Sequence, residues 1–372
     1  MVVAAVLDVF LTVLYARIGT GVLTPWVTAG LFWGFKKLAR LLPRRRDSML
    51  SFAGPSLMVA IIVLWVSMLV FGTALFIWPR LGISIQARNA NTPTDFITAL
   101  TYSGNSLTTV GNQDLTPTTP CFRTITMLQS LMGICIITLT ITYLLEVYSA
   151  LQRRNTFALG LHHSTGASAD SIEMVLGLGA SGDFAGARRE LGALGVGLLD
   201  LYESHHFFWV LTYFRFREPY YALSRIMLII LDCITLIRSA LSEKRYSHVI
   251  HSGAVGQLWN SSMHLLKEFS AVYLPTAPQE TPPQTSEQQE MVWRLRYREA
   301  LMKLKGAGIA TAEDESAGEE QYISIRREWD RYIRSITRYM MHDVKEIDVA
   351  GAAAERAVAQ LDQPRAKLRA AG

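Results

Sequence analysis

The sequence predicts an all-α membrane protein with two transmembrane helices, N-terminal membrane-associated helices before them and an all-α cytoplasmic domain after them. Two apolar segments, at residues 52–78 and 122–150, are each longer than the about 20 residues that cross a hydrocarbon core. Only 18% of the 372 residues are charged and 50% are hydrophobic, whereas soluble domains carry about 25% charged residues. Beyond the second apolar segment, helical periodicity recurs and strand-like alternation is scarce.

The basic residues predict the orientation of the two spans. Six Lys or Arg residues lie shortly before the first span and two follow the second, whereas only Arg80 and Arg88 lie between them. The six are Lys36, Lys37, Arg40, Arg44, Arg45 and Arg46. Because short loops rich in Lys and Arg stay in the cytoplasm, we expect both outer flanks to be cytoplasmic and residues 79–121 to face the exterior. The expected location is therefore the plasma (inner) membrane, with a multi-pass chain and a cytoplasmic C-terminal domain.

Residues 1–50 are predicted to form N-terminal membrane or interfacial helices. Residues 1–17 are apolar but short for a span, and they include Asp8. This segment is either an additional span or an amphipathic, half-inserted anchor. Residues 23–40 combine tryptophan, phenylalanine and leucine with three basic side chains, which is typical of a helix at the membrane surface. Membrane lipid is accordingly an expected partner.

The segment between the two spans carries the pattern of a pore loop. Residues 95–107 predict a re-entrant helix, with Thr94 as its N-cap and Asp95 in its first turn. The sequence LTTVGNQD follows at residues 107–114. A strand of this kind can replace the water around a dehydrated cation with backbone carbonyls, provided that its residues are uncharged and that glycine stands where φ is positive. Thr109, Val110 and Gly111 meet that requirement.

This loop resembles the TTVGYGD filter of potassium channels. The sequences FAGPSLM at 52–58, ITYLLEVYSALQRRN at 141–155 and ESHHFFWVLTYFR at 203–215 extend the resemblance to bacterial potassium channel family proteins of the two-pore-domain type, within the pore-loop superfamily. The resemblance implies a pore domain at residues 51–150, made of the outer helix 52–78, the pore helix 95–107, the filter 108–114 and the inner helix 122–150. Since each chain has one pore loop and a closed ring needs four, a homotetramer is expected.

The resemblance assigns the ion filter to seven consecutive residues. They are Thr108, Thr109, Val110, Gly111, Asn112, Gln113 and Asp114. Thr109, Val110 and Gly111 are expected to hold the permeant cations, which are the only metal ions expected. Asn112 stands where the family has Tyr or Phe, and Gln113 replaces the second glycine. A glutamine at positive φ costs about 1 kcal/mol or more, so we expect reduced selectivity for potassium, with sodium as a second permeant ion.

The inner helix is expected to contain the gate. An ungapped comparison places Gly133 at the hinge glycine of potassium channels. Ile137, Ile141 and Leu145 are expected to line the cavity and its cytoplasmic end, where an apolar constriction can close by dewetting. The sequence contains no recognisable set of catalytic residues, so we do not expect an enzyme. No cofactor and no nucleic-acid partner is expected either.

Residues 151–345 predict a helical cytoplasmic domain with a Pro-rich linker at 274–288, and residues 346–372 predict a tail. Helical periodicity recurs at 171–178, 183–194, 197–213, 218–241, 254–272, 288–305 and 321–344. The GxGxxG pattern at 177–182 is expected to be a helix end, because no buried strand precedes it. Residues 226–237 are expected to form a buried core helix.

Two functional hypotheses follow. The first is a tetrameric cation channel of the potassium-channel type with a TVGNQ filter, gated at the inner helix by the cytoplasmic domain. The second is a non-conducting, pore-like membrane sensor or scaffold whose helical domain binds a partner. Ion current through the purified tetramer distinguishes the two.

Overall fold

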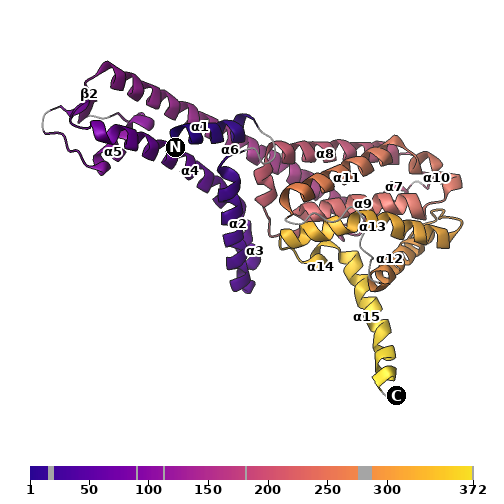
Figure 1. The fold of residues 1–372 in the computed structure, drawn as a ribbon. Helices are drawn as coiled ribbons and strands as arrows, with labels where there is room; N and C mark the ends of the chain where they lie inside the picture. Colours follow the sequence, from indigo (N-terminus) through magenta and orange to yellow (C-terminus); the bar gives the residue numbers. More distant parts are fainter. Residues whose placement is uncertain (16–20, 89–90, 112–113, 181, 275–286, 371–372) are drawn as a thin grey trace. The chain divides into compact units, whose positions relative to one another are not determined.

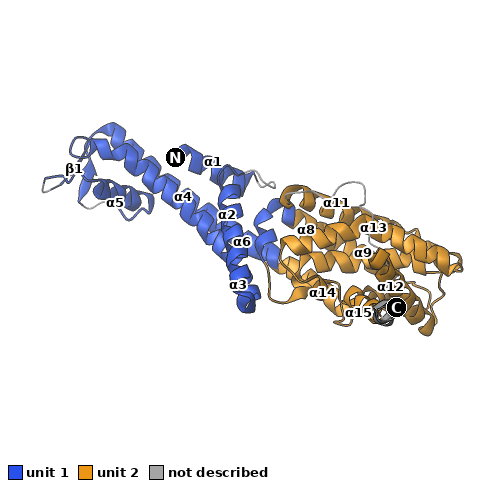
Figure 2. Cartoon of the chain, turned by 60° about the horizontal axis from the view of Figure 1, so that its bottom comes forward, with its two compact units in different colours: residues 1–151, 205–214 blue, residues 152–204, 215–372 orange. Residues whose placement is uncertain are grey.

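The chain folds into two compact units (Figure 2). The computed structural model describes residues 1–15, 21–88, 91–111, 114–180, 182–274 and 287–370, with side chains as far as residue 360. Unit 1 contains Met1–Leu151 and His205–Phe214, and unit 2 contains Gln152–Ser204 and Arg215–Gly372. In the described part of the chain the only strands are the short antiparallel pair β1 (Ile85–Ala87) and β2 (Leu115–Pro117). The predicted all-α class is therefore confirmed.

Unit 1 is built around two long apolar helices, α4 (Ala53–Ile77) and α6 (Pro120–Ser164), with the shorter α5 (Phe96–Leu107) between them in sequence (Figure 1). Both long helices are apolar over enough residues to cross a membrane. A 3₁₀ turn, η3 (Trp78–Arg80), ends α4. The helix α6 continues past the predicted end at residue 150, because the residues that follow are mostly good helix formers without proline. It therefore begins in unit 1 and ends in unit 2.

The N-terminal helices of unit 1 pack on α4. The helix α1 (Val2–Val9) continues into a π-helical turn, η1 (Phe10–Leu14). A Cβ atom at Gly72 would lie 2.8 Å from Val2 Cγ2, and Asp8 contacts Trp65, so α1 runs antiparallel to α4. The next elements are α2 (Thr24–Leu41), η2 (Pro43–Arg45) and α3 (Arg46–Ser51). The apolar helical stretch Val2–Leu14 is shorter than the two span candidates, and its membrane crossing stays a prediction.

A buried carboxylate joins three of these helices. The side chain of Asp8 accepts hydrogen bonds from the Leu23 backbone N–H (2.7 Å), from Trp65 Nε1 (2.7 Å) and from the hydroxyl of Thr24. Asp8 and Thr24 are fully buried. Since a buried charge is costly unless hydrogen bonds compensate it, this carboxylate fixes α1, the start of α2 and the middle of α4 to one another.

Unit 2 is a bundle of helices and turns around a central helix, α9 (Leu223–Ala240). Its other elements follow in chain order. They are α7 (Ser171–Leu178), α8 (Ala187–Phe207), η5 (Pro219–Tyr221), α10 (Glu243–Ile250), α11 (Gly253–Tyr273), α12 (Glu287–Gly306), α13 (Glu315–Tyr339), α14 (Val344–Ile347) and α15 (Val349–Ala370). The turn η4 (Trp209–Tyr213) belongs to unit 1. The helices α7, α11 and α13 all pack on α9, and residues 226–237 are buried throughout. The prediction of a core helix there is confirmed.

Two predicted helices, at 183–194 and 197–213, form the single helix α8 up to Phe207. Gly197 of this helix allows close packing, because a Cβ atom there would lie 2.6 Å from the ring of Phe157 in α6. The GxGxxG pattern lies where α7 ends, at Leu178, with Gly179 as its C-cap. No buried strand precedes it among the described residues, as expected.

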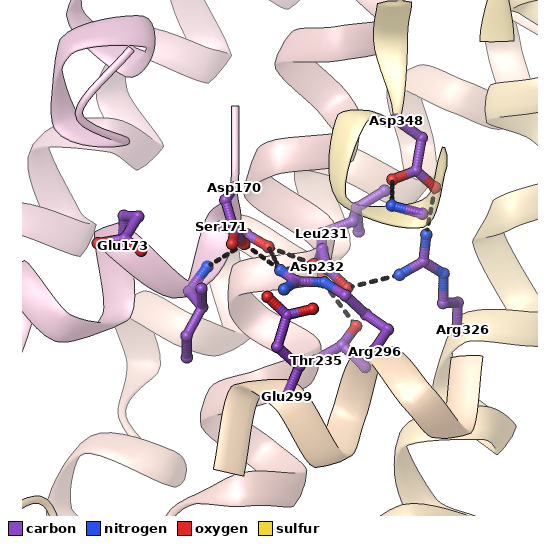
Figure 3. A network of polar contacts seen from close by, with 12 residues as sticks. Asp170, Ser171, Glu173, Leu231, Asp232, Thr235, Arg296, Glu299, Arg326 and Asp348 are labelled. Atoms are coloured by element: carbon purple, nitrogen blue, oxygen red, sulfur yellow. Dashed lines mark hydrogen bonds and ion pairs between the residues drawn. The ribbon is translucent and has the colours of Figure 1, made fainter. Parts of the chain in front are cut away.

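The centre of unit 2 holds a network of buried ion pairs (Figure 3). Asp232 of α9 accepts from Arg326 Nη1 at 3.0 Å, from Arg296 Nη2 at 3.3 Å and from the hydroxyls of Ser171 and Tyr322. Arg296 also pairs with Asp170. Burial alone would raise the pKa of Asp232, but the two arginines and the hydroxyl donors outweigh it and hold that pKa below 3.8. The carboxylate therefore stays ionised.

The C-terminal helices are tied to this network. Arg326 Nη2 lies 2.7 Å from Asp348, which in turn accepts from the Gly351 N–H at the start of α15. Gly351, Ala354 and Val358 are buried, and α15 packs on α12. The residues predicted as a tail at 346–372 are thus helical as far as Ala370, because small side chains allow α15 to approach α12 closely. Most of the predicted linker at 274–288 lies outside the described residues.

Candidate pore-loop site

The helix α5 begins one position later than the sequence suggested. Asp95, not Thr94, is its N-cap, and its carboxylate accepts from Thr98 N (3.0 Å) and Thr98 Oγ1 (2.8 Å). These hydrogen bonds from Thr98 lower the pKa of Asp95. Asp95 thus supplies both the cap and the negative charge that favours a helix N-terminus. The predicted Thr94 cap was wrong. Threonine and aspartate are both favoured N-caps, so the pattern around Thr94 and Asp95 fits either start of the helix.

An apolar cluster seats the outer half of α5 against both long helices. It contains Ala74 and Ile77 of α4, Ala99 and Tyr102 of α5, and Phe122 of α6, all buried. At the other end of α5, Leu107 is buried against Leu69 of α4, Ile136 of α6 and Ala5 of α1. Because both ends of α5 contact α4 and α6, the orientation of α5 is fixed, and so is the position at which the loop begins.

A ladder of polar contacts also joins α5 to α6. Its rungs are Tyr102 Oη with Thr126 Oγ1 (3.0 Å), Gln129 Nε2 with the Ser103 carbonyl (3.0 Å) and hydroxyl (2.9 Å), and Ser130 Oγ with the Ser106 carbonyl (2.8 Å). The hydroxyl of Ser103 donates onward to the Val70 carbonyl of α4 at 2.9 Å. The sequence interpretation missed this ladder. Its signal is the helical spacing of polar residues inside otherwise apolar segments.

Gly133, predicted as a hinge, lies against the end of α5. A Cβ atom at position 133 would overlap the carbonyl oxygen of Leu107 and lie 2.8 Å from its carbonyl carbon. Glycine is therefore the residue that permits this approach. The helix α6 is continuous through this position, and the hinge role stays a prediction.

The segment after α5 has an unusual backbone. Thr108 is the C-cap of α5, Thr109 has φ of 61° and Gly111 has φ of 83°. A β-branched residue at positive φ is a genuine outlier, and such strain costs about 1–3 kcal/mol and concentrates at functional sites. The Gly111 N–H donates back to the Asn105 carbonyl at 3.3 Å, and the Val110 side chain is 74% exposed.

The outer part of the predicted filter is described only at its end. Asn112 and Gln113 lie outside the described residues. Asp114 is exposed, and its carbonyl accepts from the Arg88 N–H at 3.0 Å, next to the pairing of β1 with β2. The two short strands thus anchor both ends of the segment that contains α5 and the loop.

The predicted gate residues form one exposed row on α6. Ile137, Ile141 and Leu145 follow one another at helical spacing, and the Leu145 side chain is 65% exposed in the single chain. Ile134 extends the row toward the loop and is also exposed. The structure therefore places these residues on a common face but does not pack them against their own chain.

Residues 205–214 return from unit 2 to unit 1 and contact α6 on both sides of Leu145. Phe208 packs on Tyr143 and Phe214 packs on Tyr148, each with ring centroids 5.9 Å apart. Tyr213 also packs edge-on against Phe32 of α2 at 4.9 Å. This short segment therefore contacts both α2 and the part of α6 where the gate is expected.

The comparisons with known proteins agree with this architecture. Residues 60–150 match the family model described as ion channel. The chain is 26% identical over 285 residues to the uncharacterized membrane protein YdjJ of Bacillus subtilis (strain 168). The aligned residues make up 76% of this chain and 80% of that protein. No solved structure matches the chain. The protein is an all-α membrane protein in which residues 60–150, from the outer helix to the inner helix, match an ion-channel domain.

Proposed function

We propose that four copies of this chain form a cation channel of the potassium-channel type, with Thr108 to Asp114 as its filter. The carrying observation is the backbone that follows α5, where Thr109 and Gly111 both have positive φ and Val110 between them does not. Alternation of this kind turns successive carbonyls toward one side of a strand, which is the arrangement that a dehydrated cation requires. The ion-channel match over residues 60–150 supports the same function.

The tetramer is supported by the exposed side chains of a single chain. Val110 and the row from Ile134 to Leu145 are apolar and uncovered, and a contiguous apolar row of this kind marks an interaction surface or a lipid contact. A four-fold arrangement turns these residues inward to line a cavity. Mass measurement of the purified protein tests this, and a monomer or dimer would rule out a shared pore.

The conducted ion is proposed to be potassium, with weaker discrimination against sodium than a GYG filter achieves. Asn112 and Gln113 replace the aromatic residue and the glycine of that filter, so fewer successive carbonyl sites are available. Planar-bilayer recordings in mixed potassium and sodium give the reversal potential. The double variant Asn112→Tyr with Gln113→Gly should shift it toward the potassium equilibrium value. An intact tetramer without current under all gating conditions would favour the non-conducting scaffold.

Gating is proposed to occur around Ile141 and Leu145 under the influence of unit 2, the proposed cytoplasmic domain. Residues 205–214 contact Tyr143 and Tyr148 and are continuous in sequence with unit 2 on both sides. A truncation after Gln152 would remove this segment of unit 1 as well, so a point variant is the sharper test. Phe208→Ala should change the open probability of an intact tetramer. Phe207→Ala, an exposed neighbour, serves as its control.

A further inference from the structure

The helix α2 carries an exposed face that no other part of the described chain covers. Thr24, Thr28, Phe32 and Ala39 form its buried face, and the opposite face presents Trp26, 80% exposed, and Trp33, 63% exposed. These tryptophans are seven positions apart and share a face with Lys37. Exposed tryptophans are unusual on a surface in water but are enriched where a membrane meets water.

Four exposed basic side chains lie on α2 and in the turn that follows it. Lys37, Arg40, Arg44 and Arg45 are exposed, and no carboxylate in the described residues pairs with them. The ammonium of Lys37 lies 5.2 Å from the ring centroid of Trp33, a cation–π contact that holds the charge beside the aromatic ring. Arg44 and Arg45 lie in η2, directly after α2.

The direction of α2 suits a helix that lies on a membrane. Within unit 1, α2 and α3 lead away from the axis of α4, the first membrane-capable helix (Figures 1 and 2). Asp8 holds the N-terminal end of α2 to Trp65, in the middle of α4. The exposed tryptophans, Lys37 and Arg40 therefore belong to a helix that starts beside a membrane-capable helix and then leaves its axis, and Arg44 and Arg45 follow in η2.

We propose that Lys37, Arg40, Arg44 and Arg45 bind the headgroups of anionic phospholipids, with Trp26 and Trp33 inserted at the level of the glycerol backbone. Four exposed cations without internal carboxylate partners favour an anionic ligand, and the adjacent exposed tryptophans favour an apolar environment. An anionic lipid surface satisfies both requirements, whereas a soluble anion satisfies only the first. This assignment concerns lipid binding and does not depend on ion conduction.

The test measures which lipids stay bound to the full-length protein. The chain is reconstituted in equal parts of phosphatidylglycerol and phosphatidylcholine, re-extracted in mild detergent, and the retained lipids are quantified by mass spectrometry. Each basic residue beside an anionic surface strengthens binding about fivefold. We therefore expect clear enrichment of phosphatidylglycerol on the wild type. The quadruple variant Lys37→Gln, Arg40→Gln, Arg44→Gln and Arg45→Gln should lose it.

Two matched variants separate this site from general charge and from misfolding. Neutralising Arg188, Arg189, Lys244 and Arg245, all exposed in unit 2, removes the same charge and should leave the enrichment intact. Exchanging the four basic residues for one another (Lys37→Arg, Arg40→Lys, Arg44→Lys, Arg45→Lys) keeps the charge and should keep the enrichment. Unchanged enrichment in the neutralised α2 variant would overturn the proposal. So would wild-type binding of inorganic phosphate without any preference for phosphatidylglycerol.

Discussion

Gly133 of α6 contacts the carbonyl group of Leu107, the last residue of α5. The inner helix therefore touches the backbone immediately before the proposed filter, at a distance that only glycine allows. Any motion of α6 at this level moves the end of α5, or the contact must open. The same glycine can thus transmit a change in α6 to the segment proposed as the filter.

Replacing Gly133 with alanine should destabilise the protein and reduce its ion flux. The added methyl group overlaps the Leu107 carbonyl, and overpacking of this kind costs about 1–3 kcal/mol. Thermal unfolding in detergent and flux into proteoliposomes measure the two effects. Gly160→Ala is the matched control, since position 160 lies in the same helix with nothing within 4 Å. It should be neutral or slightly stabilising, and equal loss in both variants would contradict this account.

Replacing Gln129 with leucine should loosen α5 from α6. The change removes both hydrogen bonds to Ser103 while keeping most of the side-chain volume, and an unmade buried hydrogen bond costs about 1–3 kcal/mol. We expect a lower unfolding temperature and faster amide exchange in α5. Gln152→Leu, at an exposed position of the same helix, should change neither quantity. Full protection of α5 in the Gln129 variant would show that apolar packing alone holds it.

Replacing Asp8 with asparagine should release α1 and α2 from α4. The carboxylate accepts from Trp65, from Thr24 and from the Leu23 backbone, whereas an amide turns two donors of its own toward some of these groups. Hydrogen bonds to a charged group contribute about 1.5–3 kcal/mol each. Exchange of the Trp65 indole N–H, followed by NMR, should accelerate. Trp65→Phe, which removes a single donor, should destabilise the protein less than the Asp8 variant does.

Acid should unfold unit 2 through Asp232. Burial raises the pKa of this carboxyl, but Arg326, Arg296 and the hydroxyls of Ser171 and Tyr322 lower it by more than burial raises it. The folded pKa therefore lies below the ordinary value of 3.8. A depressed folded pKa contributes stability that is complete above the unfolded pKa and is lost as the pH falls through the folded one. Thermal unfolding followed by circular dichroism should therefore show a lower unfolding temperature below about pH 4.

Asp232→Asn should lower stability at neutral pH by about 1.5–3 kcal/mol, because both arginines lose one buried, charged hydrogen-bond partner while Arg296 keeps Asp170 and Arg326 keeps Asp348. The same variant should also be less sensitive to acid than the wild type. Asp200→Asn breaks a half-exposed pair with Arg153 and should cost less than about 1 kcal/mol. An Asp232 variant with unchanged neutral stability would show that the network is not required for folding.

The features that the sequence predicted are those encoded locally. The two spans follow from runs of apolar residues, α5 from its position between them, and the resemblance of the loop from a contiguous stretch around Thr109. The missed features depend on partners distant in sequence. Gln129 gains its hydrogen-bond partner Ser103 only when α5 packs beside α6. Asp8 likewise gains the Trp65 indole N–H only when α4 packs beside α1. The Ala-rich C-terminal segment gave no indication that Arg326 would secure it through Asp348.

The ion network of unit 2 also constrains when this unit can fold during synthesis. Asp232 emerges from the ribosome long before Arg296, Arg326 and the Asp348 that completes the set. Until then its carboxylate has no cationic partner in the central helix α9, and burying it alone is unfavourable. The membrane helices leave the ribosome first, so membrane insertion can precede closure of unit 2. A premature stop before residue 326 would leave an inserted unit 1 attached to an unfinished bundle, which is a substrate for quality-control proteases.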